Sequence, residues 1–544
     1  MPTLDFKGKP FVYSHHLSVP FRELKIDAAR SLPGKAGLSL DDNLIIHGDN
    51  LHALKALLPK YAGKVDVIYI DPPYNTGNEG WAYNDNVNSP LMKEWLGEVV
   101  DGDDLERHDK WLCMMWPRLV LLRELLSETG TLFISINELE RDNLVKVSKE
   151  IFGDECYLGT FIWKSRLSED TRNKTGFSDD HEYVLILSNA EKIKGAESDK
   201  TKFKNPDDDP RGPWRSADMT GILPKSMRPN CHYDLTNPKT GLVYSCPPKG
   251  WRFDRKGMQS RLDEDRVLWP KEQTGRPRQK LYLNELTNKL KNVSSFIPNI
   301  NTAMGTREIS ALGFDTNFLF PKPTELVKFV LERSTNEDAI VLDSFAGTGT
   351  TAQAVQALNV EDGGNRKFIL IETENYADTI TAERVRRVIQ GVPKAKDEAL
   401  KNGLGGSFTY CDLGDPIDME SFFGDSGSMP AYDQLASYIA YTATGEALGK
   451  APKKPAKDWF IGEVGGVRLH LIYKPDGDFM KSHQAALDME TVKTIAAGNK
   501  SGKQSYVFAA AKYMGQSELT RDYDMTFCQL PYAIHRIMGD GVDG

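Results

Sequence analysis

The sequence has few cysteines and no long apolar run. Among 544 residues there are six cysteines, and no two of them form a CxxC pair. This spacing favours neither a zinc site nor a disulfide framework, so we predict no metal site and reduced cysteines, as in a cytoplasmic protein. No stretch of about 18 apolar residues is present. The first ten residues, MPTLDFKGKP, lack the apolar core of a secretory signal, so we expect no membrane-spanning helix or signal peptide.

The net charge of the chain is negative, but positive charge is concentrated in one region. The net charge is −9, which by itself argues weakly against a polyanionic partner. Residues 201–300 nevertheless hold 19 Lys and Arg against 11 Asp and Glu, a balance of +8 that leaves −17 for the rest of the chain. A basic segment in an acidic protein indicates a surface for a polyanion. A solvated loop region with a chance imbalance of charge is the alternative.

Short β-branched strands alternate with helices in two separate stretches. In the first, the strand 65–70 (VDVIYI) ends at two prolines, which cannot continue a hydrogen-bonded ladder. In the second, the strand 339–343 (AIVLD) leads into a glycine turn and a helix over 350–358. This alternation predicts an α/β fold with a Rossmann-like, mostly parallel sheet.

The composition changes between these two stretches. Residues 191–310 are rich in Pro, Gly, Trp and Arg and show no sustained hydrophobic periodicity, which predicts an inserted domain. The predicted organisation is an N-terminal arm (1–40), a first part of the α/β domain (41–190), the inserted domain (191–310), a second part of the α/β domain (311–400), and a small α+β C-terminal domain (401–544) that serves dimerisation or partner binding.

A turn bearing a carboxylate and an aromatic ring follows the strand 65–70. The sequence Asp71-Pro72-Pro73-Tyr74-Asn75 lies where parallel strands end, which is where α/β sheets bind ligands. The prolines stiffen the turn and remove two N–H donors. Asp71 and the Pro72 carbonyl can accept the hydrogens of an amino group while Tyr74 stacks on a flat ligand. A strand-ending turn with a surface aromatic is the alternative.

The strand 339–343 also ends at a turn, and this one contains glycines. In Asp343-Ser344-Phe345-Ala346-Gly347-Thr348-Gly349-Thr350-Thr351 the glycines let the backbone approach a ligand closely. The pattern is not GxxxxGK[ST], so we expect no phosphate cradle. Glu372 ends the next strand, 23 positions after Gly349, a placement that suits ribose hydroxyls. The turn therefore predicts a cofactor without phosphates.

These motifs together resemble the amino-methyltransferase family of DNA-modifying enzymes, in the arrangement with the catalytic motif before the cofactor motif. The matching segments are HGDN at Asp49, DPPYN at 71–75, FIW at Trp163, FPKP at Phe320–Pro323, DSFAGTGTT at 343–351 and FILIE at Glu372. The segments GDNLHALKALLP, DPPYNTG and LFISINELERDNL further resemble the modification (Mod) subunit of type III restriction–modification systems. The resemblance spans about 40–410 and, more weakly, the C-terminus.

The resemblance implies S-adenosylmethionine as the cofactor and roles for particular residues. The implied catalytic residues are Asp71, Pro72, Pro73 and Tyr74. The implied cofactor-binding residues are Asp49, Lys322, Pro323, Asp343, Phe345, Gly347, Gly349, Thr350 and Glu372. A helix N-cap is the alternative role for Asp49, and a surface lysine is the alternative for Lys322. Because Asp71 and Asp343 are 272 positions apart, these roles require that the two turns end as neighbours around one crevice.

The activity implied is methyl transfer to N6 of an adenine flipped out of DNA. The lone pair of such an amine is delocalised, and hydrogen bonds to Asp71 and the Pro72 carbonyl can localise it. No Cys or Lys nucleophile stands in the motif, which disfavours C5-cytosine methylation. The alternatives are N4-cytosine methylation, methylation of RNA or of a protein amide, and an inactive DNA-binding specificity subunit. The aspartate at the start of DPPY favours adenine.

The inserted domain is the predicted target-recognition domain. The candidate DNA contacts are Arg211, Arg215, Arg228, Arg252, Arg255, Arg276 and Arg278. We expect Trp214, Trp251 and Trp269 to anchor the core of this domain. The expected partners are double-stranded DNA and a second copy of the chain. No nuclease or helicase signature appears, so any cleavage would need a separate restriction subunit.

Overall fold

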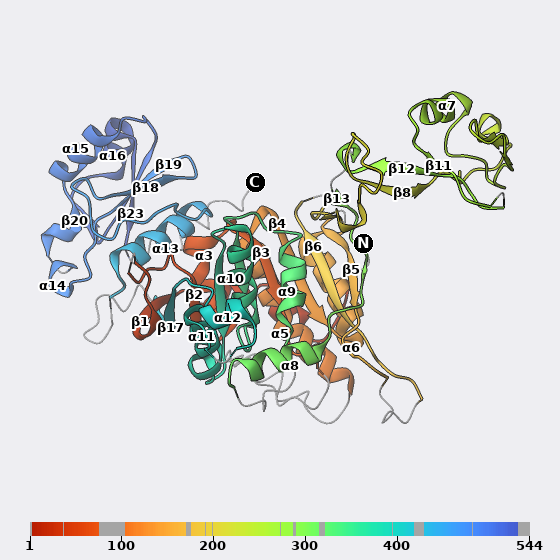
Figure 1. The fold of residues 1–544 in the computed structure, drawn as a ribbon. Coiled ribbons are helices and arrows are strands. Elements are labelled where there is room, and N and C mark those ends of the chain that lie inside the picture. Colours follow the sequence, from red (N-terminus) through yellow and green to blue (C-terminus); the bar gives the residue numbers. More distant parts are fainter. Residues whose placement is uncertain are drawn as a thin grey trace. The chain divides into compact units, whose positions relative to one another are not determined.

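The chain folds into two compact units in the computed structural model (Figure 1). The larger unit comprises Met1–Ile193 and Ser294–Gly544, and the smaller one comprises Lys194–Val293. Phe320 of the FPKP segment and the last two residues of DPPYNTG lie outside the described residues. The structure describes residues 3–35, 37–75, 104–169, 176–190, 192–197, 200–272, 274–286, 290–314, 321–393, 395–417, 429–480 and 482–530.

A ten-stranded sheet forms the framework of the larger unit. Its strands, in spatial order, are β1 (Arg22–Leu32), β17 (Phe408–Pro416), β2 (Leu44–His47), β16 (Lys367–Glu372), β15 (Ile340–Asp343), β3 (Val65–Ile70), β4 (Leu126–Ile136), β6 (Glu182–Ser188), β5 (Tyr157–Trp163) and β14 (Phe296–Ile297). The six strands from β17 to β4 are parallel to one another. β6 is antiparallel to both of its neighbours, and β1 is antiparallel to β17. The predicted α/β fold with a mostly parallel sheet is confirmed.

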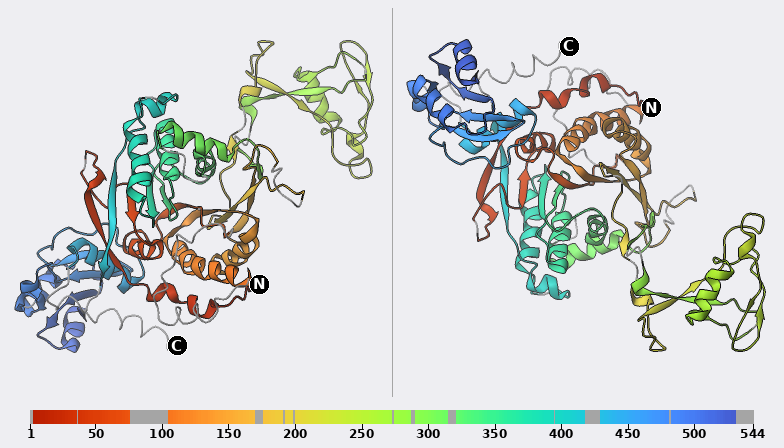
Figure 2. Two further views of the ribbon diagram at one scale, coloured as in Figure 1. Left: turned by 90° about the horizontal axis from the view of Figure 1, so that it is seen from below. Right: turned by 90° about the horizontal axis from the view of Figure 1, so that it is seen from above.

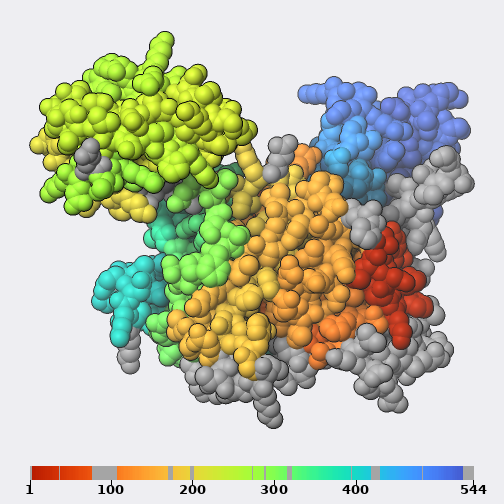
Figure 3. Space-filling model, turned by 90° about the vertical axis from the view of Figure 1, so that its right-hand side faces the viewer, coloured from red at the N-terminus to blue at the C-terminus, as the bar shows by residue number. Residues whose placement is uncertain are grey.

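Helices cover both faces of this sheet (Figure 2). The helices α3 (Asn50–Tyr61), α5 (Asp104–Leu125) and α6 (Glu138–Phe152) lie on one face, and α9 (Thr324–Leu331), α10 (Thr350–Asp362) and α11 (Glu383–Gln390) lie on the other. The central strands are buried almost throughout, as parallel strands covered on both faces must be. The short helices α1 (Lys9–Val12) and α2 (His15–Ser18) pack against α5, and Figure 3 shows these red N-terminal residues beside the orange ones.

The sheet is wider than the sequence pattern predicts. β1 comes from the predicted N-terminal arm, and β17 comes from the range assigned to the C-terminal domain. The two strands pair with each other, and β17 also pairs with β2. Nearly 400 residues separate β1 from β17, so local periodicity carries no sign of this pairing. The helix α5 ends at Leu125, and β4 begins directly after it at Leu126.

Residues 429–530 form a further layer with its own hydrophobic core within the larger unit. Its sheet has the order β18–β19–β21–β23, with β18 antiparallel and the other three strands parallel. The elements are α13 (Tyr432–Thr444), β18 (Phe460–Val464), β19 (Val467–Leu471), α14 (Gly477–Met480), β20 (Ala486–Leu487), α15 (Met489–Gly498), β21 (Ser505–Ala509), β22 (Ala511–Lys512), α16 (Gln516–Tyr523) and β23 (Met525–Gln529). α13 packs against α3, which joins this layer to the large sheet.

The smaller unit is built from short strands around a small core. Its elements are β7 (Ala196–Glu197), β8 (Trp214–Asp218), β9 (Leu235–Thr236), β10 (Val243–Tyr244), α7 (Arg255–Asp263), β11 (Val267–Leu268), β12 (Arg278–Tyr282) and β13 (Leu290–Lys291). Trp251 is buried in this core and donates its indole N–H to Tyr233 O at 2.7 Å. Trp269 packs against the same cluster, so both act as core anchors, as predicted. Trp214 differs, because it is half-buried and donates to Asp207 Oδ1.

Within the described ranges, no helix is long and apolar enough to cross a bilayer.

A buried hydrogen-bond chain ties the helix α3 to the glycine turn. Asn50, the first residue of α3, donates its amide to Ser344 O at 2.9 Å. Its own amide oxygen accepts from Arg118 Nε of α5 at 2.6 Å. Asn50 and Arg118 are fully buried, so water cannot replace either bond. This chain therefore fixes the start of α3 and the turn after β15 relative to α5.

Replacing Asn50 should destabilise the larger unit. Asn50→Ala removes one partner each from the Arg118 guanidinium and the Ser344 carbonyl, and we expect the free energy of unfolding to fall by about 1–3 kcal/mol. Denaturant unfolding followed by tryptophan fluorescence measures the change. The exposed Asn336 is the matched control, and Asn336→Ala should stay within about 0.5 kcal/mol of the parent. Equal stability of both variants would contradict this role of Asn50.

Candidate active site

The two predicted turns lie at neighbouring strand ends. β3 and β15 are adjacent and parallel, with Val67 opposite Val341 and Ile68 opposite Leu342. Asp71 follows β3, and Asp343 is the last residue of β15. β16 lies on the other side of β15 and ends at Glu372. Three carboxylates therefore meet at the same edge of the sheet, and the two turns adjoin as the prediction requires.

The glycine turn is shaped by the two carboxylates beside it. Glu372 accepts the backbone N–H of Gly347 at 2.7 Å and that of Glu374 at 2.9 Å. Asp343 accepts the N–H of Phe345 at 3.0 Å and the hydroxyl of Thr351 at 2.5 Å. Burial raises the pKa of each of these carboxyl groups, Glu372 and Asp343, to about 7. Both groups therefore titrate near neutral pH.

Glycine is required within this turn. Gly347 and Gly349 have φ angles of 51° and 79°, in the left-handed region that side chains disfavour. A Cβ on Gly349 would also lie 3.1 Å from Thr381 O, whereas one on Gly347 would meet its nearest atom, Phe345 O, only at 4.0 Å. The space beside Gly347 is thus open to a ligand. Phe345 is buried in the main hydrophobic core and so anchors the turn to it.

Two predicted cofactor residues have structural partners of their own. Asp49 caps α3, accepting from Leu51 N at 2.9 Å and His52 N at 3.2 Å, so the N-cap role is realised. The hydroxyl of Thr350 donates to Lys322 O at 3.1 Å and accepts from Arg384 at 2.8 Å. These contacts hold both side chains in place, and their contact with a cofactor stays a prediction.

Arg384 of α11 was not predicted from the sequence. It is fully buried, and its guanidinium also donates to Thr348 at 2.7 Å and twice to Gln353. Burial lowers the pKa of Arg384 to about 10. Arg384 shares its helix face with the buried Val388, four residues later, so helical periodicity is the signal that separates it from its neighbour Arg387.

The turn after β3 is held by aromatic and amide contacts. Trp111 of α5 donates its indole N–H to Pro73 O at 2.7 Å, and Pro72 is buried. Asn75 adopts a left-handed φ of 57°, and its amide donates to Arg107 O at 3.3 Å and to the carboxylate of Glu140. The Pro73 carbonyl is therefore occupied, and the turn is fixed in one conformation.

Lys322 is enclosed by what we term the cage, formed by Asp71, Tyr74, Trp163 and Glu182. Its ammonium donates to Tyr74 OH at 2.7 Å and to Glu182 Oε2 at 3.1 Å, and it lies 3.1 Å from Asp71 Oδ1. The Tyr74 ring centroid is 4.6 Å away and that of Trp163 is 5.5 Å away. Only 11% of the Lys322 side chain is exposed, so it is not the surface lysine of the alternative. Pro323 is buried directly before α9.

The cage keeps its phenol neutral and its lysine charged. Burial and the carboxylates of Asp71 and Glu182 raise the pKa of Tyr74 well above its usual value. Burial opposes the charge on Lys322, but the same two carboxylates outweigh it and raise the pKa of that ammonium. Burial raises the pKa of Asp71, and the Lys322 ammonium offsets part of this rise. Glu182, which sequence reasoning missed, therefore binds both the phenol and the ammonium of the cage.

One buried acceptor in the cage lacks an aligned donor. Asp71 Oδ1 is buried and receives no hydrogen bond of good geometry from the described residues, although the Lys322 ammonium lies 3.1 Å from it and, with the Tyr74 hydroxyl, opposes the rise in the pKa of this carboxyl. Beside the glycine turn, the buried hydroxyl of Ser344 likewise has no hydrogen-bond partner in the described part of the chain. Orphaned buried polar atoms of this kind are expected where a ligand completes the hydrogen bonds.

The predicted DNA-contacting arginines lie in the smaller unit, and most are exposed. The exposed ones are Arg215, Arg228, Arg252, Arg255, Arg276 and Arg278. Arg278 donates to Ser216 Oγ at 2.7 Å, and Arg255 lies 4.7 Å from the Tyr233 ring. Arg211 differs, because it donates twice to Asp209 and once to Glu264 O. Its guanidinium is thus used within the domain.

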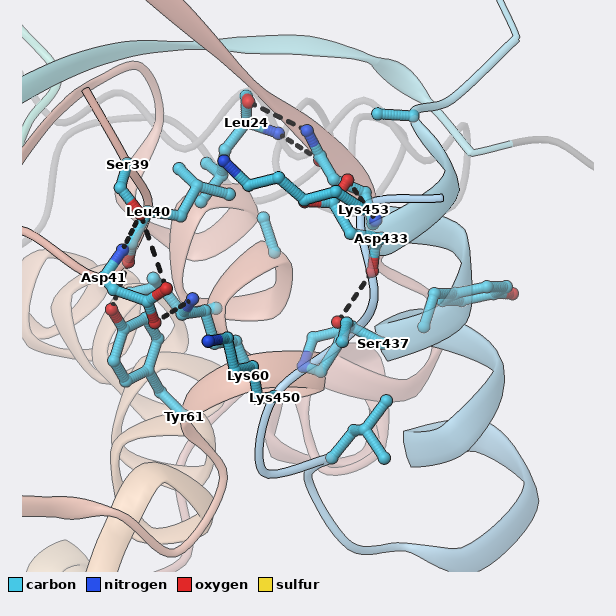
Figure 4. Close-up of a pocket in the computed structure, with 18 of the residues that line it drawn as sticks. Leu24, Ser39, Leu40, Asp41, Lys60, Tyr61, Asp433, Ser437, Lys450 and Lys453 are labelled. Carbon is cyan, nitrogen blue, oxygen red and sulfur yellow. Dashed lines mark hydrogen bonds and ion pairs between the residues drawn. The ribbon is translucent and has the colours of Figure 1, made fainter. Parts of the chain in front are cut away.

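A separate cavity of about 640 Å³ lies in the larger unit (Figure 4). Leu24 of β1, Tyr61 of α3 and Ser437 of α13 line it, and an ion pair between Lys60 and Asp41 spans 2.6 Å at its wall. None of the predicted catalytic or cofactor-binding residues lines this cavity. It is therefore distinct from the site at the strand ends.

Comparison with known proteins identifies a family for this chain. A family model described as DNA methylase, covering N6 and N4 methyltransferases, matches residues 65–383, more than half of the chain. The Mod subunit of the type III restriction–modification enzyme StyLTI from Salmonella typhimurium is 34% identical over 403 residues, which cover 67% of this chain and 59% of that protein. The Mod subunit of EcoP15I from Escherichia coli is 29% identical over 555 residues, covering 88% of this chain and 83% of that one.

Among solved structures, the M1.HpyAVI–SAM complex covers 63% of this chain and 98% of its own, with 16% identity and a TM-score of 0.29, a distant likeness. The family match extends from the strand before DPPY to the helix after Glu372, and so contains both turns and the inserted unit. The resemblance stated from the motifs is confirmed: the chain belongs to the DNA methylase family of N6 and N4 amino-methyltransferases.

Proposed function

We propose that this chain transfers a methyl group from S-adenosylmethionine to N6 of an adenine flipped out of DNA. The observation that carries the proposal is that the two turns are adjacent. Asp71, which can accept hydrogen bonds from an amine, and the open glycine turn at Gly347 lie at the ends of neighbouring parallel strands. Both reactants can then meet in one crevice.

The residues at the glycine turn fit this cofactor. The open space beside Gly347 admits a nucleoside close to the backbone. Glu372 uses one lone pair on each oxygen for backbone N–H groups, and a carboxylate has about four acceptor sites, so ribose hydroxyls can still bind it. Ser344 adds a hydroxyl without a partner among the described residues. When bound, the cofactor supplies an electrophilic methyl group on a sulfonium sulfur.

The residues after β3 suit activation of an aromatic amine. Asp71 Oδ1 is buried and has no aligned donor in the described part of the chain, so it can accept an N6 hydrogen, and the Pro72 carbonyl is the second candidate acceptor. Hydrogen bonds to these oxygens strengthen as positive charge develops on nitrogen, and they therefore favour the transition state. No covalent nucleophile is needed, and the proton leaves the methylated amine to solvent.

Tyr74 supplies a stacking surface for the base. Its hydroxyl is fixed by Glu182 at 2.8 Å, and the Lys322 ammonium covers one face of its ring. We infer that the flipped adenine stacks on the other face, where stacking worth about 1–3 kcal/mol offsets part of the cost of extrusion.

Duplex DNA is the proposed substrate, and the smaller unit is the proposed target-recognition domain. The basic balance of residues 201–300 and their exposed arginines support this assignment. The relatives named Mod subunits belong to type III restriction–modification enzymes. We therefore propose that this chain serves as a modification subunit, with a restriction subunit as its partner and a second copy of itself in the active assembly.

The methylated nucleoside tests the activity directly. Incubation with labelled S-adenosylmethionine and DNA, followed by nucleoside digestion, should yield N6-methyladenine. Asp71→Ala should reduce the yield at least about 100-fold, because the charge-bearing acceptor is lost, while DNA binding remains measurable. Asp142→Asn, an exposed site on α6, is the control. Label in N4-methylcytosine would instead identify cytosine as the target, and full activity of Asp71→Ala would contradict the mechanism.

Cofactor affinity should rise with pH. The pKa of Glu372 is raised to about 7, so its ionised fraction grows between about pH 6 and pH 8. Ribose hydroxyls donate to the ionised form, and we expect calorimetry to show binding roughly 3–10-fold tighter at the higher pH. Glu372→Gln should lose much of this dependence, leaving the part due to Asp343, whereas Glu374→Gln should keep it. An unchanged dependence in Glu372→Gln would overturn the assignment.

Exposed arginines of the smaller unit should carry DNA affinity. Replacing Arg215, Arg252 and Arg276 together by Ala should weaken DNA binding about 10–100-fold at low salt and flatten its salt dependence, because phosphate contacts are lost. Fluorescence anisotropy measures both quantities, and cofactor affinity should not change. Arg307→Ala, an exposed arginine of the larger unit, is the control. Parent-like salt dependence of the triple variant would exclude these contacts.

A further inference from the structure

Glu182 has contacts in the cage that the proposed mechanism does not use. It is the first residue of β6 and pairs across the sheet with Trp163, so both side chains belong to the same pair of antiparallel strands. Its Oε2 accepts from Tyr74 OH at 2.8 Å and from the Lys322 ammonium at 3.1 Å. Its side chain is 18% exposed. One carboxylate oxygen therefore binds two groups that lie 248 positions apart in the chain.

Glu182 and Asp71 compete for the same ammonium. The cage holds two carboxylates and one lysine, and Lys322 Nζ lies 3.1 Å from an oxygen of each. An ammonium has three hydrogens. Two of them are directed to Tyr74 OH and Glu182, and the contact with Asp71 Oδ1 lacks hydrogen-bond geometry. Lys322 thus supplies charge to Asp71 without occupying its acceptor oxygen.

This arrangement matters because the target amine needs that oxygen. If the Lys322 ammonium turned fully toward Asp71, it would form a charge-assisted hydrogen bond, which is stronger than the bond a neutral amine can offer. The amine would then have to displace an ammonium before methyl transfer. Glu182 opposes this turn by electrostatic attraction, and the hydroxyl of Tyr74 opposes it with a second hydrogen bond.

We propose that Glu182 is a positioning residue for methyl transfer, which holds the Lys322 ammonium against Tyr74 and so keeps Asp71 Oδ1 open to the target amine. This inference rests on the proposed function and deepens it. It assigns Lys322 a place beside the reacting amine in addition to any contact with the cofactor. Glu182 itself does not touch the reacting atoms.

A double-mutant cycle tests the proposal. Glu182→Gln keeps the shape and an acceptor oxygen but removes the charge, so Lys322 should turn to Asp71 and the single-turnover rate at saturating cofactor should fall roughly 10–100-fold. Adding Lys322→Met removes the competitor, and the double variant should regain at least about 5-fold over Glu182→Gln. A residue needed only for folding would not produce this recovery. Glu128→Gln, exposed on β4, is the control and should match the parent.

Two further measurements separate the outcomes. Cofactor affinity by calorimetry should be the same in Glu182→Gln and the parent, and thermal melting should show both folded. Losses that simply add in the double variant, or a Glu182→Gln rate equal to that of the parent, would overturn the positioning role. A parent protein that methylates no nucleoside in DNA would instead overturn the proposed function, so the two failures are distinguishable.

Discussion

Parallel pairing of β3 with β15 is the constraint on which the site depends. The hydrogen-bonded register of Val67 with Val341 sets Asp71 and Asp343 at the same edge of the sheet, although 272 positions separate them. Pairing of β15 with β16 adds Glu372 at the next position. A slip of register would move these carboxylates relative to one another and turn alternate side chains to the other face. The buried β-branched residues of the three strands therefore hold the site together as well as the core.

Around this edge, buried charges are held by specific partners. Glu372 and Asp343 bind backbone N–H groups of the glycine turn and the residues beside it, and Arg384 is surrounded by hydroxyl and amide oxygens. Lys322 is shared between Asp71 and Glu182. Buried charges without such partners would be costly, and groups fixed in this way need little reorganisation during a reaction. The same contacts that stabilise the fold thus define the electrostatics of the crevice.

The two units divide the chemistry. The larger unit holds every predicted catalytic and cofactor residue that the structure describes, and the smaller one holds the predicted DNA-contacting arginines. Within the smaller unit, Trp251 is committed to the core and Arg211 to Asp209, while Arg252 and Arg276 remain exposed. The proposed recognition surface lies on a separate small core, and can therefore vary without disturbing the strand pairing at the proposed methyl-transfer site.

The sequence by itself determined the α/β class, the two turns, the cofactor chemistry and the family, because these depend on local periodicity and on residues adjacent in the chain. The β1–β17 pairing, Glu182 in the cage and Arg384 beneath the glycine turn were decided only by the tertiary structure. Each of them depends on contacts between residues tens to hundreds of positions apart; helical periodicity marks Arg384 as buried, but it does not show what Arg384 contacts. Asp49 shows that a motif can also leave a role open. The sequence fits both a helix cap and a ligand contact for this residue, and in the structure Asp49 caps α3.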